Sequence, residues 1–146
     1  MFEASSGMGT RAVLRCNLEP FSYGKDLWLA THWDGMDVGN TLAEYLKVEF
    51  AREHERNKDL KLRDLGGSIQ KACVKTAGEH HMDAASVDGE ALFNQQYGDF
   101  AEYEWRLKPN TNKNCVVIEH RKLSGEWKGS SAKNNFKSTL KVCTNK

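Results

Sequence analysis

The sequence predicts an α+β fold: a single two-layer domain in which an antiparallel sheet of about five strands carries two helices on one face. Two alternating segments come first, two segments with helical periodicity follow, and three alternating segments close the chain, which gives the order ββααβββ. The length of 146 residues suits one domain with its own core. Without an internal repeat or long linker, we expect residues 10–146 to form this domain and residues 1–9 a flexible leader.

The first two strands are predicted by alternation of apolar and polar side chains. "TRAVLRCNL", residues 10–18, places Leu14 and Cys16 on one face and Arg15 on the other. "EPFSYGKD" contains a proline and a glycine and predicts a turn. "LWLATHW", residues 27–33, predicts a second strand that pairs with the first as an antiparallel hairpin.

Two helices are predicted next. "NTLAEYLKVEFAREHERN", residues 40–57, repeats its apolar residues at helical spacing, and Thr41 with Glu44 forms the pattern of a capping box. "LKLRDLGGSIQKACVKTAG", residues 60–78, has the same spacing and ends in a glycine. Because glycine disfavours helix interiors, we expect this helix to begin at Gly66–Gly67 or to bend there.

Three strands are predicted after a polar, irregular loop at residues 79–99. "FAEYEWRL", residues 100–107, places Trp105 and Leu107 on one face and three charges on the other. "CVVIEHRKL" is rich in β-branched residues, and "FKSTLKV" alternates, so both predict strands.

The cysteines and the apolar runs bear on location. Cys16, Cys73, Cys115 and Cys143 are far apart in the sequence and form no CxxC motif. We therefore expect reduced thiols and a cytoplasmic protein. "MFEASSGMG" lacks the basic and apolar regions of a signal peptide, and no apolar run approaches the roughly 20 residues of a membrane helix, so we expect no membrane association.

The net charge is +1, but the charges are unevenly placed. Residues 106–146 contain ten basic and two acidic residues. This basic third could bind nucleic acid, with lysines on phosphates and aromatic residues stacking on bases. We favour a solvated sheet face whose lysines protect a sheet edge, because Trp105 shares its strand face with Leu107 and the RNP-type aromatic pattern is absent.

The main candidate site is "LATHWDGMDVGN", residues 29–40. Because His32 and Asp34 are two positions apart on a strand, they point to the same face and could act as base and orienter or as two metal ligands. A helix N-terminus follows, which attracts anions. The candidate binding residues are Arg11, His32, Asp34, Asp37 and Thr41. The alternative is a purely structural turn.

Other chemical motifs are weak. "GEHHMD", residues 78–83, holds four potential metal ligands, but its spacing is neither HExxH nor HxH, so we expect a solvated loop and no metal. The chain has no GxSxG elbow and no cysteine near a histidine, which leaves a nucleophilic hydrolase unsupported. No Walker loop or GxGxxG is present, and we expect no cofactor.

Three segments, residues 10–18, 29–46 and 98–107, together resemble a group of small phage and bacterial proteins of unknown function. Those proteins begin with a "TR" strand, continue with an "RHWDGYPEG" segment before a helix, and later have a "gDieYxY" strand. The matching residues are Thr10, Arg11, His32, Trp33, Asp34, Gly35, Gly39, Asp99 and Tyr103. Met36 and Asp37 replace the group's Tyr and Pro, so the resemblance does not establish that this protein and the group bind the same ligand. The resemblance implies a mobile genetic element as the source and no particular chemistry.

These observations favour a small cytoplasmic accessory protein that binds a small ligand or a protein partner at the strand-to-helix loop, residues 32–39. A second hypothesis is a hydrolase or nucleotide-processing enzyme that uses His32 and Asp34. A third is nucleic-acid binding through the basic C-terminal third. A homodimer is also compatible with the sequence, since polar strands with Trp-bearing faces often pair across a two-fold axis.

Overall fold

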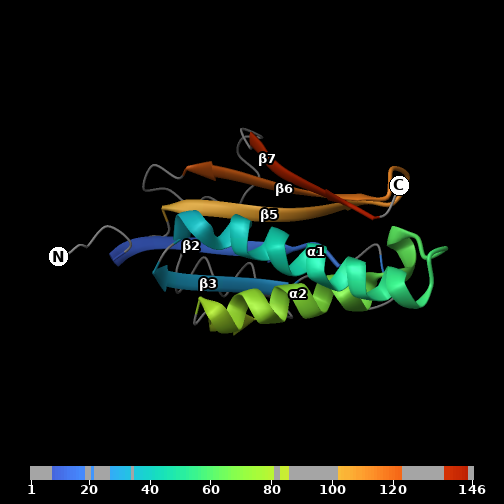
Figure 1. Ribbon diagram of the computed structural model, residues 1–146. Coiled ribbons are helices and arrows are strands. Elements are labelled where there is room, and N and C mark those ends of the chain that lie inside the picture. The colour runs from blue at the N-terminus through green and yellow to red at the C-terminus, as the bar shows by residue number, and fades with distance from the viewer. Residues whose placement is uncertain are drawn as a thin grey trace.

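The computed structural model describes residues 8–18, 21, 27–33, 35–80, 83–85, 102–122 and 137–144 (Figure 1). The side chains of residues 8–10, 31–33, 83–85 and 137–139 lie outside this description. Two short 3-10 helices, η1 (Gly35–Asp37) and η2 (Leu62–Asp64), precede the two α-helices. The α-helices and strands are α1 (Val38–Arg56), α2 (Gly66–Glu79), β2 (Met8–Cys16), β3 (Leu27–Trp33), β4 (Asp83–Ala85), β5 (Tyr103–Asn110), β6 (Cys115–Lys122) and β7 (Lys137–Cys143).

The described strands form one six-stranded sheet in the order β4-β3-β2-β5-β6-β7. The α+β class is therefore confirmed, but the prediction of a purely antiparallel sheet is wrong. At the centre, β2 pairs parallel to β5, with Leu14 opposite Trp105, while the other pairs are antiparallel. Alternation reveals which side chains share a face, but it does not reveal the direction of the neighbouring strand.

Most element boundaries lie close to those predicted, and the β2–β3 hairpin is confirmed with Leu14 opposite Leu29. The capping box is wrong, because α1 begins earlier and Thr41 lies inside its first turn. Helix α2 begins at Gly66, as one of the two alternatives predicted, and it continues past Gly78. Strand β4 was missed, since three residues in a polar segment carry no readable alternation.

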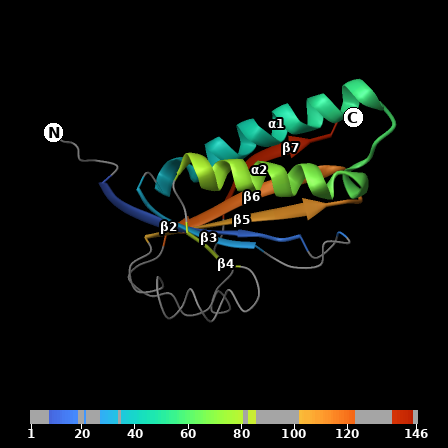
Figure 2. The same cartoon turned by 90° about the horizontal axis from the view of Figure 1, so that it is seen from below.

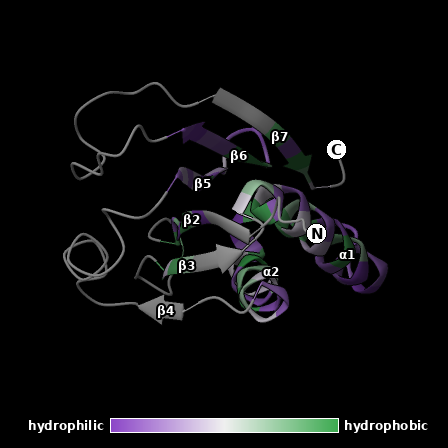
Figure 3. Ribbon diagram, turned by 90° about the vertical axis from the view of Figure 1, so that its left-hand side faces the viewer, coloured by the Kyte–Doolittle hydropathy of each residue, from purple (hydrophilic) through white to green (hydrophobic). Residues whose placement is uncertain are grey.

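The main core lies between the sheet and the two helices, which are on the same side of the sheet (Figure 2). From the sheet, Leu14, Leu107 and Ile118 point into this core and are fully buried. Leu46 of α1 and Ile69 of α2 meet them from the helices. Figure 3 shows the same arrangement end-on, with hydrophilic residues on the outer side of α1.

The other face of the sheet carries buried charges. Arg121 Nε donates to Glu104 Oε1 at 2.7 Å, and the two residues are only 8% and 1% exposed. Beside them, Arg106 Nε donates to Glu119 Oε1 at 2.9 Å. The expectation of a solvated face for residues 106–146 is therefore wrong at Arg121. Burial raises the pKa of Glu104, against the opposing effects of Arg121, Arg106 and Arg15; among the described residues, none donates a hydrogen bond to its Oε2.

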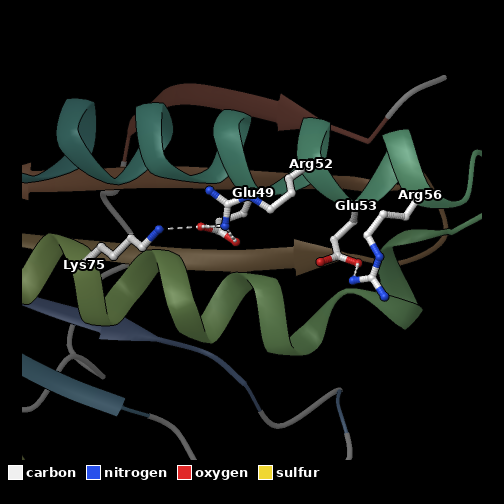
Figure 4. Close-up of polar contacts among 5 residues, drawn as sticks. All are labelled: Glu49, Arg52, Glu53, Arg56 and Lys75. Carbon is white, nitrogen blue, oxygen red and sulfur yellow. Dashed lines mark hydrogen bonds and ion pairs between the residues drawn. The ribbon is translucent and has the colours of Figure 1, made fainter.

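The two helices are joined by an ion-pair cluster around the buried carboxylate of Glu49 (Figure 4). Lys75 Nζ of α2 donates to Glu49 Oε2 at 2.8 Å, and Arg52 Nη1 of α1 donates to the same oxygen at 3.2 Å. Arg52 Nη1 also donates to Glu49 Oε1 at 3.4 Å, so both carboxylate oxygens of Glu49 have hydrogen-bond donors. These bonds replace the water that the carboxylate loses when it is buried between the helices. The cluster favours one register of α2 against α1.

The expectation of four reduced thiols is wrong for two of them. Cys115 and Cys143 form a disulfide between β6 and β7, where they stand directly opposite each other. Their separation of 28 residues hid this pairing, since only the register of the two strands brings the sulfurs together. Cys16 and Cys73 are buried thiols that belong to no disulfide, as expected. In the described part of the chain, no helix is both long and apolar enough to cross a membrane.

Replacing Gly39 with alanine should destabilise the protein, because the added methyl group would lie 2.2 Å from Trp105 Cζ3. We expect the free energy of unfolding to fall by about 1–3 kcal/mol in urea denaturation. Gly78, in α2, is the matched control because a Cβ there meets nothing within 4 Å. Gly78→Ala should raise stability by about 0.5–1 kcal/mol. Equal effects of the two changes would refute the steric role of Gly39.

Replacing Arg121 with methionine should cost roughly 3–5 kcal/mol of unfolding free energy, because it leaves the buried carboxylate of Glu104 without its cation. A double variant, Glu104→Met with Arg121→Met, should lose less than the sum of the two single changes. The exposed pair of Lys47 and Glu44 is the control, where Lys47→Met should cost less than about 0.5 kcal/mol. Additive losses at Glu104 and Arg121 would show that the pair is not coupled.

Candidate functional site

The strand-to-helix loop is fixed in place by Trp105. The indole Nε1 of Trp105 donates to the carbonyl oxygen of Gly35 at 2.7 Å, in a buried hydrogen bond. One turn further, Gly39 lies so close to the indole ring that a Cβ could not fit. The absence of a side chain at Gly39 therefore lets the first turn of α1 rest directly on the sheet. On its other side, Trp105 stacks on His120, with ring centroids 4.9 Å apart.

The predicted site residues are only partly brought together. Asp37 and Thr41 lie side by side at the start of α1. Arg11 is half-buried in β2, where its carbonyl oxygen accepts a hydrogen bond from the backbone N–H of Glu102 at 2.8 Å. The backbone of His32 belongs to β3, while its side chain and the whole of Asp34 lie outside the described residues. The pairing of His32 with Asp34 therefore stays a prediction.

Thr41 links the start of α1 to the end of α2. Its hydroxyl Oγ1 donates to the carbonyl oxygen of Asp37 at 3.1 Å and lies 2.8 Å from His80 Nε2. The direction of the bond between Thr41 and His80 depends on which ring nitrogen of His80 carries the proton. His80 is 8% exposed, which means that this hydrogen bond is largely shielded from water. The two helix ends are thus held together by a threonine–histidine contact.

An open pocket of about 520 Å³ lies between these helix ends, and we call it the helix-end pocket. Tyr45, one turn after Thr41, donates its phenolic Oη to Glu79 Oε1 at 2.6 Å across the pocket. The lining residues are Asp37, Asn40, Thr41, Glu44, Tyr45, Glu79 and His80. Carboxylates, an amide, a hydroxyl, a phenol and an imidazole therefore face one hollow, and all are able to bond a polar ligand.

The electrostatics of the helix-end pocket are dominated by its three carboxylates. Asp37 occupies the N-cap position of α1, where the positive end of the helix dipole favours a negative charge. Glu79 is the last residue of α2, where the dipole is negative and opposes its charge. The hydrogen bond to Glu79, with smaller effects of burial and of the Glu79 charge, raises the pKa of Tyr45 above its ordinary value.

Sequence reasoning found this corner but not its full set of residues. Asp37 and Thr41 were identified from the loop, whereas Glu79 and His80 were considered only as metal ligands. Over the residues that the structure covers, no three His, Cys, Asp or Glu side chains are placed to hold a metal ion. Tyr45 belongs to the helical apolar repeat of residues 40–57 and packs partly against the core. Its position four residues after Thr41 did place both on one side of the helix.

Part of the positive charge of the basic C-terminal third is engaged in ion pairs within the protein. Arg106 and Arg121 bond to Glu119 and Glu104, as described above. The exposed basic side chains described in this third are those of Lys108, Lys113, Lys122 and Lys141. The aromatic residue Trp105 is buried, so it offers no surface on which a base could stack. The ion pairs and the burial of Trp105 therefore weaken the support that the number of basic residues gives to a nucleic-acid interface.

Comparisons with protein-family models, with curated proteins and with solved structures found no match. Function is therefore proposed from the geometry of the helix-end pocket.

We expect the phenol of Tyr45 to ionise above its ordinary pKa of about 10, because it donates a hydrogen bond to Glu79. The stabilisation from this bond is present below that ordinary value and is lost as the pH rises through the raised pKa. Glu79→Ala should move the Tyr45 pKa down. Absorbance at the tyrosinate band, with Tyr45→Phe subtracted, measures it. An unchanged titration in Glu79→Ala would show that the bond does not form in solution.

Proposed function

We propose that this protein is a small accessory protein of a mobile genetic element that binds a ligand in the helix-end pocket rather than catalysing a reaction. The ligand carries a positively charged amine or guanidinium group, on a small molecule or on the side chain of a protein partner. A cytoplasmic location agrees with this role. The observation that carries the proposal is the pocket itself, where Glu79 stands at the negative end of α2 and accepts a hydrogen bond from Tyr45.

The position of Glu79 supports a cationic ligand. A carboxylate at a helix C-terminus is electrostatically unfavourable for the fold, and lysine, arginine or histidine would suit the position better. Glu44 adds a second exposed carboxylate to the same hollow. A bound cation would relieve the repulsion that the fold leaves in place, and residues that oppose stability are often kept for function.

The size and polarity of the helix-end pocket support a small polar ligand. A volume of about 520 Å³ lies within the roughly 300–1,000 Å³ typical of small-molecule sites. The amide of Asn40 and the phenol of Tyr45 can orient a ligand by hydrogen bonds, while the carboxylates supply charge. Because the first turn of α1 rests on Trp105, this side of the pocket is preformed.

A hydrolase has less support. Thr41 and His80 are within hydrogen-bond reach, as a nucleophile and its base would be. However, Thr41 Oγ1 also donates to the carbonyl oxygen of Asp37 at 3.1 Å, so this acceptor competes with His80 for the single hydroxyl proton. The surrounding carboxylates would also repel the oxyanion that forms during acyl transfer.

The proposal is tested by titrating the protein with arginine amide and recording amide chemical shifts. We expect saturable shifts confined to Asp37, Asn40, Thr41, Glu79 and His80. Citrulline amide, which has a neutral urea in place of the guanidinium, should bind at least about tenfold more weakly, which corresponds to one lost charge-assisted bond.

Two variants make this experiment specific. Glu79→Gln keeps an acceptor for Tyr45 but removes the charge, and it should reduce binding of arginine amide by about tenfold. Glu53→Gln changes a carboxylate near the other end of α1, which pairs with Arg56, and should leave binding unchanged. Equal losses in both variants, or equal binding of citrulline amide, would rule out a cation site in the helix-end pocket.

A further inference from the structure

The disulfide between Cys115 and Cys143 lies far from the helix-end pocket along α1, at the edge of the sheet. Strand β7 is the last strand in the sheet order, and Cys143 is its final residue. Cys115 is the first residue of β6 and stands directly opposite, with the Cα atoms 3.9 Å apart. The bond therefore fastens the end of an edge strand to its neighbour.

The two sulfur-bearing residues differ in their access to solvent. Cys115 is 8% exposed, whereas Cys143 is exposed. Cys143 also lines a groove of about 450 Å³ between α1 and β7, together with Phe50 and His54. Cys143 is therefore the half of the bridge that a small thiol in solution can approach more readily. Exposed disulfides are the ones that exchange readily with thiols.

The structure also accommodates the reduced form. Cys115 Sγ lies 3.3 Å from the carbonyl oxygen of Lys113, and a thiol at this position could donate its proton there, which a disulfide sulfur cannot do. The end of β7 is held without the bridge as well. Thr144 donates from its backbone N–H at 2.8 Å and from its hydroxyl at 3.2 Å to the carbonyl oxygen of Asn114. Opening the disulfide therefore leaves the two sulfurs as neighbours.

We propose that Cys115 and Cys143 are a reversible redox pair that exchanges with low-molecular-weight thiols while the protein stays folded. A thiolate attacks the Cys143 sulfur, forms a mixed disulfide there, and releases Cys115 as a thiolate that takes a proton. A second thiolate attacks the sulfur of the bound small thiol and releases Cys143. Two small thiols are thereby oxidised to one small disulfide, and the protein disulfide is reduced to two thiols.

This pair would make the protein sensitive to the thiol balance of its surroundings. Disulfides in cytosolic proteins are mostly transient, and they serve catalysis or redox sensing. In oxidising conditions the bridge ties Cys143 to Cys115, and in reducing conditions Cys143 carries a thiol beside the groove between α1 and β7. The buried thiols of Cys16 and Cys73 take no part.

The test is to equilibrate the full chain with reduced and oxidised glutathione, alkylate it without denaturant, and count the labels by mass spectrometry. We expect Cys143 to become labelled as the buffer becomes reducing, and the shielded Cys115 to follow more slowly. Cys16 and Cys73 should stay unlabelled, and they report unfolding if it occurs. Labelling of all four cysteines together would mean that reduction requires unfolding, and it would overturn the proposal, as would a disulfide that resists reduced glutathione in the folded protein.

Two single variants test which sulfur is attacked. In Cys115→Ser, the exposed Cys143 should form a mixed disulfide with oxidised glutathione. In Cys143→Ser, the shielded Cys115 should do so at least about tenfold more slowly, because its thiolate is less accessible. Circular dichroism of both variants shows whether each is folded. Equal rates in two folded variants would contradict attack at Cys143.

Discussion

The contact between Trp105 and the start of α1 is the constraint on which the functional corner depends. The indole donates a hydrogen bond to Gly35, and its ring fills the space that a side chain at Gly39 would occupy. Together they determine where α1 leaves the sheet, and therefore where Asp37 and Thr41 stand relative to the end of α2. Because Trp105 lies on a central strand, the position of the helix-end pocket is tied to the most protected part of the sheet.

Local patterns in the sequence were enough to predict the helices, most strands and the faces that they bury. Alternation identified Leu14 and Leu107 as core residues, and the glycine pair marks the start of α2, one of the two alternatives predicted there. The features that were missed all depend on partners distant in the chain. The parallel pairing of β2 with β5, the short strand β4 and the bridge from Cys115 to Cys143 arise from the register between strands, which no local pattern encodes.

The same distinction between local patterns and distant partners applies to the residues of the candidate site. Asp37 and Thr41 could be identified, because a glycine-containing loop that leads into a helix is visible in the sequence. Glu79 and His80 carry no comparable signal, since they join the site only because α2 ends where α1 begins. The buried charges of Glu49 and Glu104 were also invisible, because a charged residue in an alternating or helical pattern is ordinarily assigned to the solvent side.

The parallel pairing of β2 with β5 divides the sheet into two antiparallel halves, β4-β3-β2 and β5-β6-β7. The residues that meet at this seam, such as Ala12 and Tyr103, are about ninety positions apart. On a growing chain, the first hairpin and both helices are complete before any residue of β5 has been synthesised. The inner edge of β2 therefore stays open for most of translation, and an open edge is where incorrect strands pair. In this fold the centre of the sheet is also the place where chaperones would have most to protect.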